Sequence, residues 1–104
     1  MTLTATTAAD GAAVIAVEGE LETGSAQLLS EAIAKAAADH PPELRLDLSG
    51  VAFVDSSGLG TILAARAALS EHSTLRIVGA RGNVVRTFER AGLTRLLEEQ
   101  PLDG

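Results

Sequence analysis

The sequence predicts an α/β domain built on a mostly parallel sheet of four or five strands, with an amino-terminal edge hairpin and about three helices. Three observations support this fold class. Apolar runs with strand periodicity alternate with segments in which apolar residues recur at helical spacing, the pattern of strands joined by helical crossovers. The alternation begins after a Thr- and Ala-rich segment and the turn signal Asp10-Gly11, which predicts a hairpin. A length of 104 residues fits one core, so we expect a single domain over residues 1–104.

The first two strands are expected on either side of that turn. Residues 2–9 are poor in large apolar groups, which favours an exposed edge strand. Residues 13–17 are apolar on both faces, which is typical of a central strand. We expect residues 19–22 to leave the sheet.

The first helix is expected next, with Thr23 or Ser25 as its N-cap. It should end near His40, because Pro41-Pro42 stop a helix. Its predicted apolar stripe comprises Leu28, Leu29, Ala32, Ile33 and Ala36.

The central part of the chain changes period from two to 3.6. Residues 43–48 predict a strand, Ser49-Gly50 a turn or bulge, and residues 51–54 a short apolar continuation. The segment Asp55-Ser56-Ser57-Gly58 follows, and a helix is expected from Ser56 to His72. The free backbone N–H groups and the positive dipole end of this helix should therefore face solvent beside two hydroxyls.

The last part predicts a buried strand over residues 75–79 and a short helix capped by Asn83 and ended by Gly92. Residues 94–98 are expected to form a last edge strand. The residues expected to face inward from the short helix are Val84, Val85 and Phe88.

Composition excludes several function classes. The chain has no cysteine, which removes disulfides, thiolate catalysis and Cys-based metal sites. A formal net charge of -6 without a Lys or Arg cluster argues against a nucleic-acid partner. No apolar run is long enough for a membrane span or resembles a signal peptide, so we expect a cytoplasmic protein without membrane insertion.

Hydrolytic chemistry finds little support in the positions of the two histidines. Ser56 or Ser57 would need a base within about 3 Å. His72 lies sixteen residues beyond Ser56 on the predicted helix, and His40 falls at the opposite edge of the sheet. A nucleophile elbow also needs glycine two residues before its serine, where this chain has Val54 or Asp55. We therefore expect that this protein is not an enzyme.

Gly58-Leu59-Gly60 leaves a nucleotide-binding module as a further alternative. The third glycine of the dinucleotide fingerprint is replaced by Leu63, so this signal is weak. Close packing of strand and helix explains Gly58 and Gly60 equally well. The carboxylates are scattered without metal-ligand spacing, so no metal or cofactor is expected; they include Asp10, Glu20, Glu22, Asp47 and Asp55.

The segment 55–60 resembles the signature of the STAS family, and specifically that of the bacterial anti-sigma factor antagonists. Gly19-Glu20-Leu21-Glu22 followed by Ser25 is similar to the family's Gly-x-Leu-Asp-x-x-Thr segment. Ala91-Gly92-Leu93 is similar to its late helix and turn. The resemblance covers about residues 12–97 in the same order, and it implies a sheet of four or five strands flanked by helices.

The resemblance implies a phosphorylation switch. Carried over by position, Ser56 is the residue that a partner kinase phosphorylates, and Ser57 is the lesser candidate. The unphosphorylated protein would bind an anti-sigma factor that is also a serine/threonine kinase, and so free the sigma factor. A phosphatase would reverse the modification, and the free protein would be a monomer. The implied partner-binding residues are Glu22, Thr23, Asp55, Ser57, Gly58, Leu59 and Gly60.

The chain departs from the family pattern at several places. Glu22 stands for the usual Asp, Ser25 for the usual Thr, and His72-Ser73 for a turn that usually contains Gly. Residues 101–104 stop before the final helix of many relatives, which predicts a less covered face of the sheet. The alternative within the family is a STAS scaffold of a signalling assembly or of a transporter system, with the same fold and no sigma cascade.

Overall fold

The computed structural model describes residues 1–69 and 73–98, which form one four-stranded sheet and four helices. The sheet order is β1-β2-β3-β4, with β1 antiparallel to β2 and the other neighbours parallel. This confirms the predicted α/β class, the mostly parallel sheet and the amino-terminal hairpin. The strands are β1 (Thr2–Thr7), β2 (Ala13–Leu21), β3 (Glu43–Val54) and β4 (Thr74–Val78), and the helices are α1 (Thr23–Ala37), α2 (Ser56–Ala68), α3 (Gly82–Arg90) and α4 (Thr94–Glu98).

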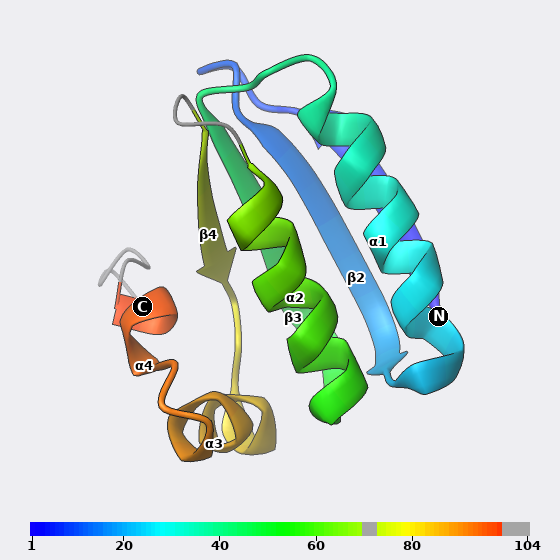
Figure 1. Cartoon of the computed structure of the whole chain (residues 1–104), viewed down its shortest axis with the longest axis vertical. Coiled ribbons are helices and arrows are strands. Elements are labelled where there is room, and N and C mark those ends of the chain that lie inside the picture. The colour runs from blue at the N-terminus through cyan, green and yellow to red at the C-terminus, as the bar shows by residue number, and fades with distance from the viewer. Residues whose placement is uncertain (70–72, 99–104) are drawn as a thin grey trace.

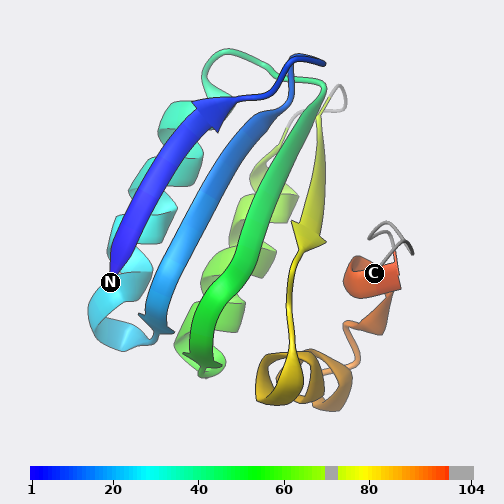
Figure 2. The same ribbon diagram turned by 180° about the vertical axis from the view of Figure 1, so that it is seen from behind.

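The helices cover the sheet unequally. Figure 1 shows α1 and α2 side by side on one face, whereas no helix lies over β1, β2 and β3 on the other face in Figure 2. Both views place α3 and α4 beyond β4. Alternate strand residues face α1 and α2, and Ile15, Leu46 and Ile77 lie side by side there without exposed surface. Burial of this apolar layer is the main favourable term in folding.

The β2 strand is longer than expected. It continues to Leu21, so the prediction that residues 19–22 leave the sheet was wrong for all but Glu22. Glu18 and Glu20 are exposed strand residues, because one face of the sheet meets solvent. The β2–β3 register shifts twice, between Ala16 and Glu18 and between Gly19 and Glu20. The first shift lies opposite Ser49-Gly50, where the sequence predicted a turn or bulge within what is one strand.

The start of α1 also differs from expectation. Glu22 is the N-cap, and Thr23 and Ser25 are the first and third helical residues. The Ser25 hydroxyl accepts a hydrogen bond from the Glu22 N–H at 3.0 Å and donates one to the Glu20 carbonyl at 2.8 Å. Within the predicted apolar stripe, Leu28 is 52% exposed, so its inclusion was wrong.

The ends of the later helices correct further predictions. Leu69 is extended (ψ 146°), so α2 ends at Ala68, short of His72; residues 70–72 lie outside the described part of the chain. Arg81, not Asn83, is the N-cap of α3. Gly92 ends α3 as predicted. Its φ of +76° lets its N–H donate to the Glu89 carbonyl at 3.0 Å.

Residues 94–98 form α4 rather than the predicted edge strand. Leu96 and Leu97 are adjacent and both buried, which a strand with one covered face does not allow. The helix packs against β4 and α3 instead. The predicted effect of residues 101–104 on sheet coverage concerns a segment outside the described residues.

Candidate functional site

Two strand-to-helix junctions meet at one edge of the sheet. Leu21 and Val54 end the neighbouring parallel strands β2 and β3 and are paired in register. The Asp55 N–H donates to the Leu21 carbonyl at 3.0 Å, so the pairing continues into the β3–α2 junction. The starts of α1 and α2 therefore lie next to each other, where parallel strands commonly present a functional site.

Asp55 fixes the start of α2. It has an extended backbone, and its Oδ1 accepts a hydrogen bond from the Gly58 N–H at 3.0 Å. This bond satisfies one of the backbone donors that a helix leaves without an intrahelical partner. Ser56 and Ser57 consequently become the first two residues of a helix whose direction is set by the cap.

The two glycines of the signature have different surroundings. A Cβ at Gly58 would lie 2.8 Å from the Leu21 carbonyl oxygen and 2.8 Å from Leu21 Cγ, so the close-packing explanation holds there. At Gly60 an added Cβ would meet no atom within 4 Å, so the same explanation was wrong for this residue. Gly58 thus allows α2 to approach the end of β2, and Gly60 faces open space.

The neighbouring hydroxyls of the signature also differ. Ser56 is exposed, and its side chain makes no hydrogen bond within residues 1–69 and 73–98. Ser57 is half-buried, and its Oγ lies 2.9 Å from Oγ1 of Thr23, the first residue of α1. One hydroxyl is therefore free at a helix start, while the other links the two helices.

The predicted partner-binding residues do not all reach the surface. Glu22 and Thr23 are exposed, and the hydrogen bond between Thr23 and Ser57 places them beside the start of α2. Leu59 is only 9% exposed and belongs to the core, and Gly58 is buried. These two residues therefore pack in the interior below the site and offer little surface to a partner. The ionisable side chains of the predicted set are the carboxylates of Glu22 and Asp55.

A groove begins at the site and follows the two helices. It has a volume of about 430 Å³, and Gly60 and Thr61 lie on its α2 side. The Thr61 hydroxyl donates to the Ser57 carbonyl at 3.1 Å. The lining residues are Thr23, Ala26, Gln27, Ser30, Ser57, Gly60, Thr61 and Ala64.

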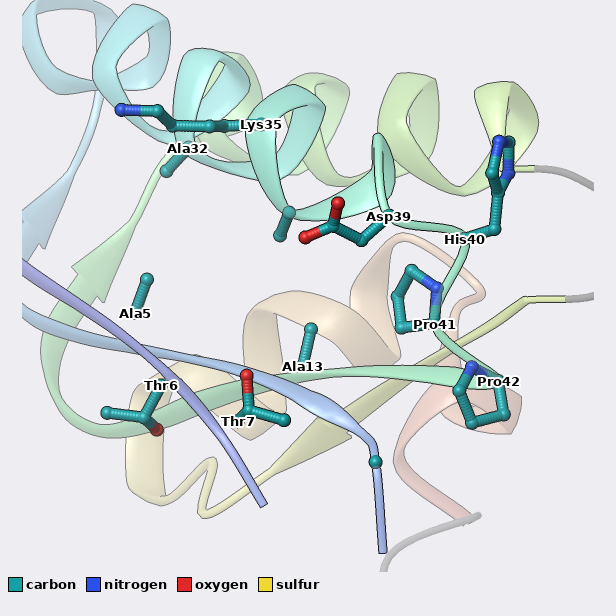
Figure 3. A pocket seen from close by; sticks show the side chains of 12 residues that line it. Ala5, Thr6, Thr7, Ala13, Ala32, Lys35, Asp39, His40, Pro41 and Pro42 are labelled. Atoms are coloured by element: carbon teal, nitrogen blue, oxygen red, sulfur yellow. The ribbon is translucent and has the colours of Figure 1, made fainter. Parts of the chain in front are cut away.

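A larger hollow, of about 480 Å³, lies at the other end of the sheet between β1, β2 and the end of α1. Figure 3 shows the Asp39 carboxylate directed into this hollow and the His40 ring turned away from it. His40 has φ 51° and is exposed, at the edge remote from Ser56. His72 lies outside the described residues.

The described residues offer neither a metal-binding cluster nor a membrane-spanning helix. Residues 1–69 and 73–98 contain no group of three or more His, Asp or Glu side chains that could hold a metal ion. The same part of the chain has no helix of the length and apolar character required to cross a bilayer.

Comparison with known proteins places this geometry in a family. A family model described as Mlab, STAS domain matches residues 4–98. The chain belongs to the STAS domain family. Its signature, residues 55–60, occupies the junction between β3 and α2 in this STAS domain.

Similar proteins carry a common name. The STAS domain is 38% identical over 77 residues to the anti-sigma-F factor antagonist RsfB of Mycobacterium tuberculosis, covering 74% of this chain and 62% of that protein, so it spans less than two thirds of this relative. It is 32% identical over 91 residues to an anti-sigma-B factor antagonist of Listeria monocytogenes, covering 86% and 80%. A crystal structure of an anti-sigma factor antagonist from Mycobacterium paratuberculosis matches with a TM-score of 0.84 and 33% identity, covering 98% of this chain and 87% of that one.

The bond between Thr23 and Ser57 is the part of this STAS domain's site that sequence reasoning missed. The two residues are 34 positions apart, and their hydroxyls meet only because the two junctions share one sheet edge. The signal in the sequence was that both hydroxyl residues come within three positions of the end of a strand. Parallel pairing of those strands would have brought them together.

Proposed function

We propose that this STAS domain is an anti-sigma factor antagonist that phosphorylation of Ser56 switches off. The unphosphorylated chain binds an anti-sigma factor that is also a serine/threonine kinase, and the sigma factor is released. Support comes from the names of relatives at 38% and 32% identity. The observation that carries the proposal is the exposed Ser56 hydroxyl at the first residue of α2, which has no hydrogen-bond partner among residues 1–69 and 73–98.

The chain contributes a hydroxyl and a binding surface to the phosphoryl transfer. The kinase supplies ATP, Mg²⁺ and the catalytic base. The bond between the γ-phosphorus and the bridging oxygen of ATP breaks, a bond from phosphorus to Ser56 Oγ forms, and the hydroxyl proton passes to the base. A phosphatase restores the hydroxyl by hydrolysis.

Local electrostatics explain how this modification would prevent binding. A phosphate on Ser56 adds a charge of about -1.5 to -2. The N-terminus of α2 stabilises that charge in water, because its backbone N–H groups and dipole favour anions. In a complex, the same group would have to fit between two packed surfaces, next to the carboxylate of Asp55. The switch therefore needs no large change of conformation.

Binding measurements on charge variants test this proposal. We expect Ser56→Ala to bind the anti-sigma factor with the affinity of the unphosphorylated wild type. Ser56→Asp should bind it at least about tenfold more weakly, because like-charge contacts in an interface cost several kcal/mol. Ala9→Asp is the matched control, because it adds the same charge in the exposed turn at the other end of the sheet. Equal affinity of Ser56→Asp and Ala9→Asp would contradict the switch.

Phosphopeptide mapping tests the modified residue. Purified chain is incubated with Mg-ATP and each candidate anti-sigma kinase of its organism, and the phosphorylated peptide is sequenced. Modification of the wild type at Ser56 and its loss in Ser56→Ala are expected. Addition of the unphosphorylated chain should also restore sigma-dependent transcription in vitro. A STAS scaffold would bind its partner without that restoration.

A further inference from the structure

Two adjacent serines in the signature present chemically similar hydroxyls, yet a kinase can distinguish them only by position. Ser56 and Ser57 are consecutive in the first turn of α2, with Asp55 before them and Gly58 after them. Both lie close to the backbone N–H groups of the helix start, so the helix dipole does not separate them. The difference must come from what each hydroxyl contacts.

The contact that separates them is made by Thr23. Its Oγ1 lies 2.9 Å from Ser57 Oγ, a normal distance for a hydrogen bond between hydroxyls. Thr23 belongs to α1, so the bond directs the Ser57 side chain toward the neighbouring helix. Ser57 is half-buried in this position, whereas Ser56 is exposed and its side chain has no partner in the described part of the chain.

We propose that Thr23 is a specificity-determining residue that disfavours phosphoryl transfer to Ser57, so that a kinase modifies Ser56 in preference. The inference rests on the proposed function and adds a residue that acts through Ser57. Thr23 touches neither ATP nor the transferred group, so it is a positioning residue. It also accounts for a threonine at an exposed helix start where it is not the N-cap.

The geometry opposes transfer to Ser57 in two ways. An acceptor oxygen must be approached in line by the γ-phosphorus of ATP while its proton passes to the kinase's base. At Ser57, the space 2.9 Å from Oγ is already filled by Thr23 Oγ1. The hydrogen bond must also break first, at a net cost equivalent to about three- to tenfold in population. In the described part of the chain, no side chain presents either obstacle at Ser56.

The first arm of the test needs no partner. In the wild type, NMR couplings between Hα and the Hβ protons of Ser57 should report one dominant side-chain rotamer. Thr23→Val removes the hydroxyl while keeping the shape of the side chain, and it should give averaged couplings. Thr23→Ser keeps a hydroxyl and should restore the single rotamer.

Thr61→Val is the matched control. Thr61 lines the same groove, but its hydroxyl bonds the Ser57 carbonyl and not the Ser57 side chain. The Ser57 rotamer should therefore be unchanged in Thr61→Val. If wild-type Ser57 shows averaged couplings, or if Thr61→Val averages them as much as Thr23→Val does, the inference is overturned.

The second arm measures phosphate on each serine after incubation with the kinase and Mg-ATP. The share of phosphate on Ser57 should rise about three- to tenfold in Thr23→Val and stay at the wild-type level in Thr61→Val and Thr23→Ser. In the Ser56→Ala background, Thr23→Val should likewise increase phosphorylation of Ser57.

The outcomes separate this inference from the proposed function. An unchanged Ser57 share in Thr23→Val overturns the role of Thr23 and leaves a switch at Ser56 intact. If wild-type chain is phosphorylated on neither serine by any candidate kinase, the proposed function fails and the selectivity role fails with it, even if the couplings show that Thr23 restrains Ser57.

Discussion

The two ends of the sheet are held together by different kinds of contact. At the carboxyl edge, backbone groups and short side chains hold the two strand-to-helix junctions together. The Asp55 N–H donates to the Leu21 carbonyl, and the Thr23 and Ser57 hydroxyls share a hydrogen bond. At the opposite end, the long Arg45 side chain forms ion pairs with Asp10 of the β1–β2 turn and with Glu43. The hollow of Figure 3 lies at that second end. Backbone groups and short side chains have few rotatable bonds, so their contacts leave little freedom of position. The carboxyl edge is therefore the end suited to presenting one hydroxyl in a defined place.

The largest expected effect breaks the carboxyl edge at Gly58. Gly58→Ala would place Cβ against the Leu21 carbonyl, and overpacking of this kind destabilises by about 1–3 kcal/mol. Gly60→Ala meets open space in the same helix and should stabilise by up to about 1 kcal/mol through helix propensity. Urea denaturation measures both. Equal free energies of unfolding for the two variants would show that the close approach at Gly58 is absent in solution.

A smaller effect is expected from the cap of α2. Asp55→Ala should lower the free energy of unfolding by about 1 kcal/mol, because the Gly58 N–H loses its acceptor. Asp55→Asn retains an acceptor oxygen and should lose only a fraction of that. At the other end, Asp39→Ala changes an exposed residue and should stay within about 0.5 kcal/mol of the wild type. If Asp39→Ala lowers the free energy of unfolding as much as Asp55→Ala does, the proposed difference between the two ends of the sheet is wrong.

The smallest effect concerns the ion pair at the opposite end and depends on pH. The Ala12 N–H and the Arg45 guanidinium hold the pKa of Asp10 below its ordinary value of 3.8. A lowered pKa stabilises the folded chain fully above that ordinary value, and the contribution disappears as pH falls through the folded-state pKa. The free energy of unfolding, measured by urea denaturation, should thus be slightly higher for the wild type than for Asp10→Asn near pH 6. The two values should converge at acid pH. A difference that grows on acidification would contradict this assignment. Added salt should also reduce the difference, because Asp10 is exposed.

The sequence was informative where one local rule acts alone. Hydrophobic periodicity predicted the parallel strands, and the change of period at Asp55 predicted the start of α2 at Ser56. Gly92 marked the end of α3 because a left-handed residue is needed there. These features depend on residues within a few positions of one another, so a single sequence contains the necessary information.

The wrong predictions arose where tertiary packing overrides local preference. Residues 19–22 were expected to leave the sheet, yet parallel pairing with β3 continues through Gly19, Glu20 and Leu21. Residues 94–98 suggested a strand, but both leucines of α4 are buried against β4 and α3. The caps Glu22 and Arg81 are residue types that seldom occupy this position. The roles of Ser56 and its neighbours in binding stay predictions.

The uneven burial of α2 has a consequence for its opening motions. Its buried residues, Gly58, Leu59 and Ile62, all lie in its first seven positions, and Leu63 is already 38% exposed. Amide hydrogens near Ile62 should therefore exchange with deuterium far more slowly than those of the last turn. We therefore expect the helix to unravel from its distal end, with the turn that bears the two serines the last to open.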